Sequence, residues 1–108
     1  MERVRIAALN DLPDGRGVRV DIGGLRVAVF RIGDDVYAIG DRCSHAEASL
    51  AEGELFDHDV ECPRHGSEFD VRTGVPDSLP ATRPVPVYDV AVEDGAVYLG
   101  VPAEEVGS

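Results

Sequence analysis

Both cysteines and two of the three histidines of this chain lie in two short segments. The segments read Cys43-Ser44-His45 and Cys62-Pro63-Arg64-His65, with sixteen residues between them. They fall within residues 41–84, which show no sustained alternation of apolar and polar residues and contain four prolines. A stretch of this length without regular structure is uncommon in a small domain unless something other than an apolar core orders it. A bound metal would supply that order.

The donor atoms of the two segments narrow the choice of metal. Thiolate and neutral imidazole are preferred protein ligands of zinc and of iron–sulfur clusters. Zinc fingers usually pair cysteine with cysteine and histidine with histidine, whereas each segment here supplies one of each. The mixed pairs favour two metal ions side by side, and a single zinc ion is the alternative. A disulfide or two free cysteines would be a third interpretation, but nothing in the sequence indicates an oxidising compartment.

The rest of the chain predicts an all-β domain. Gly, Asp and Pro recur every eight to twelve residues, which is the spacing of turns between short strands. Residues 18–22 alternate apolar and polar side chains, and Gly23-Gly24 then predicts a hairpin turn into a return strand at residues 25–32. We predict strands at residues 18–22, 25–32, 36–39, 54–56, 59–62, 85–92 and 96–99, and one helical turn at residues 46–50.

Size and charge limit the class of protein further. The chain has 108 residues, which suits a single domain with one core. Its 21 acidic and ten basic residues give a formal charge of -11, which repels phosphate backbones and excludes nucleic acid as a partner. No apolar run exceeds four residues, so we expect no membrane contact and no signal segment. We expect a cytoplasmic monomer.

The two Cys/His segments and the residues after them resemble the signature of Rieske iron–sulfur proteins. The family pattern is C-x-H followed by C-P-x-H-G-S-x-[FY]-D. This chain has Cys43-Ser44-His45 and then Cys62-Pro63-Arg64-His65-Gly66-Ser67-Glu68-Phe69-Asp70. It is also similar to Rieske ferredoxins at Gly74 and at residues 79–81 and 84–88, so the resemblance covers roughly residues 18–99.

The resemblance implies an all-β Rieske fold of three antiparallel sheets in a single domain, residues 1–108. A cluster-binding subdomain of about residues 41–82 would be inserted in a β base domain of about residues 1–40 and 83–108. The resemblance also implies one Rieske-type [2Fe-2S] cluster per chain. Cys43 and Cys62 would bind one iron, and His45 and His65 the other. Neutral histidines in place of two thiolates make such a cluster easier to reduce than an all-cysteine cluster.

Two departures from the high-potential respiratory Rieske proteins imply a lower potential within this class. Those proteins carry an additional cysteine in each loop, which form a disulfide, and a tyrosine where this chain has Phe69. This chain has only two cysteines in total. Hydrogen bonds to the cluster sulfurs raise the potential, so the missing tyrosine hydroxyl lowers it.

The chain is not expected to be an enzyme by itself. Non-haem oxygenases need a further iron bound by two histidines and a carboxylate. Only His58 remains unassigned, and we expect it to be an exposed turn residue.

The resemblance implies a single-electron carrier. It would accept electrons from a flavin-dependent reductase and pass them to a terminal non-haem iron oxygenase of the ring-hydroxylating type. Two alternatives stay open, namely a Rieske ferredoxin associated with iron–sulfur cluster assembly and the small subunit of an assimilatory nitrite reductase.

Overall fold

The computed structural model describes residues 2–22, 24–42, 49–63, 67–76 and 84–101. Within these ranges the chain is almost entirely β, as predicted, and its two helices are short 3₁₀ turns. The elements are β1 (Glu2–Ala8), η1 (Leu9–Asp11), β2 (Gly17–Ile22), β3 (Leu25–Ile32), β4 (Asp35–Gly40), η2 (Leu50–Glu52), β5 (Leu55–Phe56), β6 (Asp59–Glu61), β7 (Glu68–Asp70), β8 (Val87–Glu93) and β9 (Ala96–Val101). Neither described helix has the length or the apolar character needed to cross a membrane.

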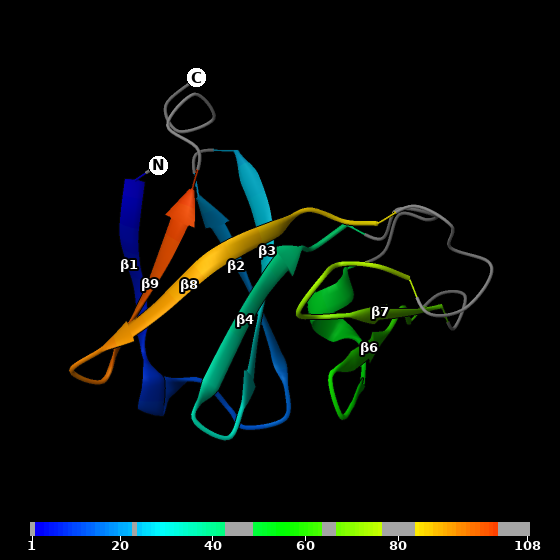
Figure 1. Ribbon diagram of the computed structural model, residues 1–108, viewed down its shortest axis with the longest axis horizontal. Coiled ribbons are helices and arrows are strands. Elements are labelled where there is room, and N and C mark those ends of the chain that lie inside the picture. The colour runs from blue at the N-terminus through cyan, green and yellow to red at the C-terminus, as the bar shows by residue number, and fades with distance from the viewer. Residues whose placement is uncertain (1, 23, 43–48, 64–66, 77–83, 102–108) are drawn as a thin grey trace.

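Three antiparallel sheets form the fold, and two of them share a strand. Strands β1, β9 and β8 pair as one sheet, and β8 also pairs with β4 of the β2-β3-β4 sheet. The result is a continuous six-stranded arrangement in the order β1-β9-β8-β4-β3-β2. Strands β5, β6 and β7 form a separate small sheet, which lies beside β4 (Figure 1). The expected all-β fold with three antiparallel sheets is confirmed.

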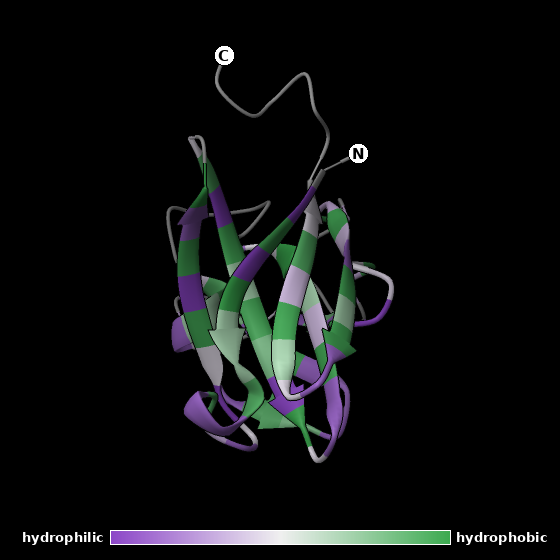
Figure 2. Ribbon diagram, turned by 90° about the vertical axis from the view of Figure 1, so that its left-hand side faces the viewer, coloured by the Kyte–Doolittle hydropathy of each residue, from purple (hydrophilic) through white to green (hydrophobic). Residues whose placement is uncertain are grey.

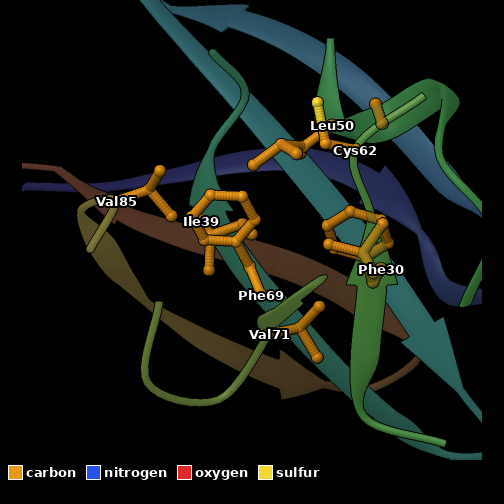
Figure 3. Close-up of a cluster of buried hydrophobic side chains, with 10 residues drawn as sticks. Phe30, Ile39, Leu50, Cys62, Phe69, Val71 and Val85 are labelled. Atoms are coloured by element: carbon orange, nitrogen blue, oxygen red, sulfur yellow. The ribbon is translucent and has the colours of Figure 1, made fainter. Parts of the chain in front are cut away.

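Strand β3 lies between two apolar cores. Successive side chains of a strand point to opposite faces. Val27 and Val29 therefore face one core, and Ala28 and Phe30 face the other, which explains why this stretch is apolar without interruption. The base core contains Leu12, Val27, Val29, Ala38, Val97 and Leu99. The site core contains Ala28, Phe30, Ile39, Leu50, Ala51, Val60, Cys62, Phe69, Val71 and Val85 (Figure 3).

Strands that face solvent on one side alternate apolar and polar side chains instead. In β2, Val18, Val20 and Ile22 pack against the base core, while Arg19 and Asp21 between them are exposed. Figure 2 shows the resulting alternation of apolar and polar bands along the strands of the large sheet. This period of two is the signal from which the sequence predicted the strands.

Every strand that the sequence predicted is present, within two residues at each end. The prediction omitted β1 and β7, which pair with β9 and β6. Of the helical turn expected at residues 46–50, Leu50 begins η2 and Ser49 before it is extended. Residues 46–48 lie outside the described residues.

Candidate metal centre

Cys62 is the one predicted ligand that the structure describes. It directly follows β6, its thiol is free, and none of the residue is exposed to solvent. The free thiol argues against the disulfide interpretation. Thiolate is the form of cysteine that binds metal, and the surrounding site core would shield such a bond from water. Figure 3 shows the sulfur of Cys62 at the same end of the site core as Leu50.

The loop that carries His65 begins at Cys62 and ends at Ser67, and these two residues are joined by a backbone hydrogen bond. The Cys62 N–H donates a 2.6 Å hydrogen bond to the Ser67 carbonyl oxygen. Ser67 is fully buried, and the next residue, Glu68, begins β7 opposite Glu61 of β6. The pairing of β6 and β7 thus fixes both ends of the second Cys/His segment.

The segment that carries Cys43 and His45 is closed in the same way. Arg42 and Ser49 form an antiparallel bridge, and the Leu50 N–H donates a 2.6 Å hydrogen bond to the Asp41 carbonyl oxygen. The first Cys/His segment therefore also begins and ends at paired backbone. Cys43, His45 and His65 themselves lie outside the described residues, so the four-ligand set remains a prediction.

Close backbone approach joins the two anchored segments. Gly53 is the residue directly after η2. A Cβ atom placed on it would lie 1.9 Å from the carbonyl oxygen of Glu61, the residue before Cys62. Any side chain at Gly53 would force these backbones apart. Leu50, whose N–H closes the loop that carries the first Cys/His segment, belongs to the same buried core as Cys62. The ends of both Cys/His segments thus meet at one core.

Phe69 fills the site core beside these anchors. It lies in β7, opposite Val60 of β6, and is fully buried. The sequence indicates two features of Phe69, namely that it lacks a hydroxyl group and that it is a core residue, and its ring does pack in the apolar core (Figure 3). Without a hydroxyl, this side chain can donate no hydrogen bond to a cluster sulfur.

The turn after β7 is held by an ion pair. Arg72 donates from its guanidinium to both carboxylate oxygens of Asp70, at 3.1 and 2.9 Å, and its backbone N–H donates to the same carboxylate at 2.8 Å. These hydrogen bonds favour the charged carboxylate and hold the pKa of Asp70 below its ordinary value. The Gly74 N–H closes the turn on the Asp70 carbonyl oxygen at 2.7 Å.

His58 differs in part from the prediction. It does lie in the turn between β5 and β6, but it is half-buried, and its ring is T-shaped to that of Tyr37 from β4 at a centroid distance of 5.7 Å. Its carbonyl oxygen accepts a hydrogen bond from the Val71 N–H. His58 thus contacts the large sheet from the small one.

Asp41, which no sequence pattern marked as a site residue, is fully buried directly after β4. Its carboxylate accepts hydrogen bonds from the Ser49 hydroxyl and the Ala51 N–H, at 2.7 and 2.9 Å. An acidic residue two positions before the first cysteine was visible in the sequence. Nothing local distinguished it from the other 20 acidic residues, because the donors to its carboxylate lie eight and ten positions away.

Among the described residues, no group of three or more His, Cys, Asp or Glu side chains could hold a metal ion. The described part of the chain therefore offers no rival to the predicted ligand set. Two thiols and two imidazoles are the donor set of a Rieske cluster, in which histidine replaces cysteine on one iron. The buried free thiol of Cys62 and the paired ends of both Cys/His segments fit such a cluster.

The sequence and the fold match known proteins along nearly the whole chain. Residues 2–89 match the model of the Rieske [2Fe-2S] domain. The 3-phenylpropionate/cinnamic acid dioxygenase ferredoxin subunit of Escherichia coli (strain K12) is 42% identical over 103 residues, which cover 94% of this chain and 96% of that protein.

Solved structures agree with this match. The ferredoxin of carbazole 1,9a-dioxygenase from Nocardioides aromaticivorans IC177 superimposes with a TM-score of 0.91 at 42% identity, covering 94% of this chain and all of that chain. A complex of reduced oxygenase and oxidized ferredoxin in carbazole 1,9a-dioxygenase contains a chain that is 43% identical, with a TM-score of 0.85 and coverage of 90% and 91%. A putative NADH-dependent nitrite reductase small subunit from Mycobacterium tuberculosis is 28% identical, with a TM-score of 0.85 and coverage of 94% and 96%.

The signature in the sequence, the three-sheet fold and these matches agree. The chain belongs to the Rieske [2Fe-2S] domain family and is a ferredoxin that carries a Rieske-type [2Fe-2S] cluster.

Proposed function

We propose that this ferredoxin takes single electrons from a flavin-dependent reductase and delivers them to a terminal non-haem iron oxygenase. The observation that carries the proposal is the 42% identity to a dioxygenase ferredoxin subunit, which extends over 96% of that relative. The related chain in a complex with its oxygenase supports an oxygenase as the acceptor. We further propose that the protein acts as a cytoplasmic monomer, and that its net charge of -11 guides it to basic docking surfaces.

We propose Cys43, His45, Cys62 and His65 as the four ligands of the cluster. The cluster supplies reversible one-electron chemistry when bound. The chain would supply the two Cys/His segments, residues 43–45 and 62–65, the anchors at their ends and an apolar core that excludes water. We assign the segments to a cluster-binding subdomain of about residues 41–82 in a base of about residues 1–40 and 83–108.

We also propose a low reduction potential for a Rieske centre. Phe69 offers no hydroxyl group, and the chain has no further cysteine with which to form a bridge between the two segments. Fewer hydrogen-bond donors to the cluster sulfurs stabilise the added electron less.

The nitrite reductase alternative has weaker support, because the similar small subunit shares 28% identity with this chain against 42% for the dioxygenase ferredoxins. No observation favours a role in cluster assembly.

Electron transfer can be tested by anaerobic mixing. Purified ferredoxin is reduced by NADH through the flavoprotein reductase of a 3-phenylpropionate or carbazole dioxygenase system, and the visible absorbance of the cluster is followed. Addition of the oxygenase should then reoxidise the ferredoxin. The proposal is wrong if the oxygenase does not reoxidise the protein but a sirohaem nitrite reductase does.

The ligand set can be tested separately with matched histidine variants. We expect His45→Gln and His65→Gln to abolish the Rieske electron paramagnetic resonance signal, and Cys43→Ser and Cys62→Ser to prevent cluster assembly. His58→Gln is the control, because His58 packs on Tyr37 and is not a proposed ligand. Wild-type protein with zinc and no acid-labile sulfide would contradict the ligand proposal.

A further inference from the structure

Asp41 is a fully buried carboxylate beside the first Cys/His segment. A buried charge destabilises a fold unless hydrogen bonds and an opposite charge compensate it. The Ser49 hydroxyl at 2.7 Å and the Ala51 N–H at 2.9 Å both donate to Oδ1 of Asp41. These donors come from the far end of the segment that carries Cys43 and His45, so the side chain of Asp41 spans the base of that segment.

The backbone of Asp41 makes two further hydrogen bonds. Its carbonyl oxygen accepts from the Leu50 N–H at 2.6 Å, and its N–H donates to the Arg26 carbonyl oxygen at 3.0 Å. Through these hydrogen bonds, Asp41 connects the two ends of the loop that carries the first Cys/His segment to each other and to strand β3.

The charge of Asp41 is only partly compensated. Its Oδ2 accepts from the Arg26 guanidinium at a long 3.4 Å, and the Arg26 side chain is 39% exposed. The Arg26 Nε is buried without a hydrogen-bond partner, so the guanidinium is not aligned with the carboxylate as a bidentate pair. Covalent geometry limits the separation of the Asp41 and Cys43 Cα atoms to about 7 Å. Because Asp41 is only two residues before Cys43, its negative charge would oppose the addition of an electron at a cluster bound there.

From this geometry we propose that Asp41 is a positioning residue for the iron–sulfur cluster. Its side chain holds the first Cys/His segment closed, and its charge lowers the reduction potential. The inference rests on the proposed assignment of Cys43 and His45 as ligands.

Three variants separate the two effects. Asp41→Ala removes both the hydrogen bonds and the charge. Ser49→Ala removes one donor and keeps the charge. Asp41→Asn removes the charge but keeps an oxygen that can accept from Ser49 and Ala51. Asp21→Asn is the charge control, because Asp21 is exposed on β2, lies opposite Arg26 in the β2–β3 register, and pairs with Arg19.

The first measurement is the rate at which the holoprotein releases iron to a chelator. We expect release from Asp41→Ala to be at least tenfold faster than from wild type, which corresponds to about 1.4 kcal/mol. Release from Ser49→Ala should lie between the two. The second measurement is the reduction potential, which we expect to be higher in Asp41→Asn than in wild type and unchanged in Ser49→Ala and Asp21→Asn.

The inference is wrong if Asp41→Ala and Ser49→Ala release iron within twofold of wild type, or if Asp41→Asn has the potential of Asp21→Asn. If Asp41→Ala does not fold, the two milder variants still decide the result. Failure of the ligand assignment would look different. In that case Cys43→Ser would retain a wild-type cluster, whatever the Asp41 variants do.

Discussion

Phe69 gives the most direct test of how the site core supports the cluster. The residue is fully buried in β7 and packs in the same core as Cys62. Phe69→Ala would remove the ring and leave a cavity beside the backbone that fixes the second Cys/His segment. We expect a large loss of stability and, with it, faster loss of the cluster.

The magnitude follows from burial. Complete burial of a phenylalanine side chain contributes about 1.5–3 kcal/mol relative to exposure. A residual cavity of about 50 Å³ adds about 1.2 kcal/mol, at about 24 cal/mol per Å³. The free energy of unfolding should therefore fall by about 3–4 kcal/mol, which would lower the melting temperature by at least about 12 °C in a domain of this size.

Thermal unfolding of the holoprotein, followed by far-ultraviolet circular dichroism and by cluster absorbance, measures the effect. Phe56→Ala is the matched control, because Phe56 belongs to the same small sheet but is 49% exposed. We expect the control to lose about 1 kcal/mol or less. Equal shifts in the two variants would refute the conclusion that the packing of Phe69 stabilises the site.

Three further predictions concern the turn after β7 and the net charge. Gly74→Ala should destabilise the protein by about 1–3 kcal/mol more than Gly95→Ala in chemical denaturation. Both glycines have positive φ, but a Cβ on Gly74 would lie 2.2 Å from the Val85 carbonyl oxygen, whereas one on Gly95 meets nothing within 4 Å. Equal losses would show that the close approach is unimportant. The lowered pKa of Asp70 means that its pairing with Arg72 stabilises the fold above the unfolded pKa of about 3.9, and that this contribution disappears as pH falls through the lower folded pKa. Arg72→Gln should therefore lower the melting temperature slightly at pH 6 and less at pH 3, and a gap that widens in acid would contradict this. Finally, reduction by the flavoprotein reductase should slow as salt is added, because the charge of -11 is screened. A flat salt dependence would mean that the charge serves only solubility.

The sequence predicted most of the local structure. Alternation along residues 18–22, the glycine turn and the apolar return segment 25–32 specified β2, β3 and their hairpin, because strand period and turn chemistry are local properties. It did not predict β1, because the partner of β1 is the last strand of the chain and no local pattern encodes a pairing across that distance. It also omitted β7, which is only three residues long and is specified by its pairing with β6.

The sequence by itself identified the family and predicted the ligands of the site. The mixed Cys/His pairs and the residues that follow Cys62 identified the family, because donor type and spacing are covalent properties of the chain. Only the tertiary structure decided how those pairs are supported. In the sequence Asp41 is one acidic residue among 21, and only the fold brings Ser49 and Ala51 to its carboxylate. The fold likewise pairs Phe69 with Val60 of β6 and buries its ring. Burial and hydrogen bonding arise from contacts between distant segments, so they become visible only once the chain has folded.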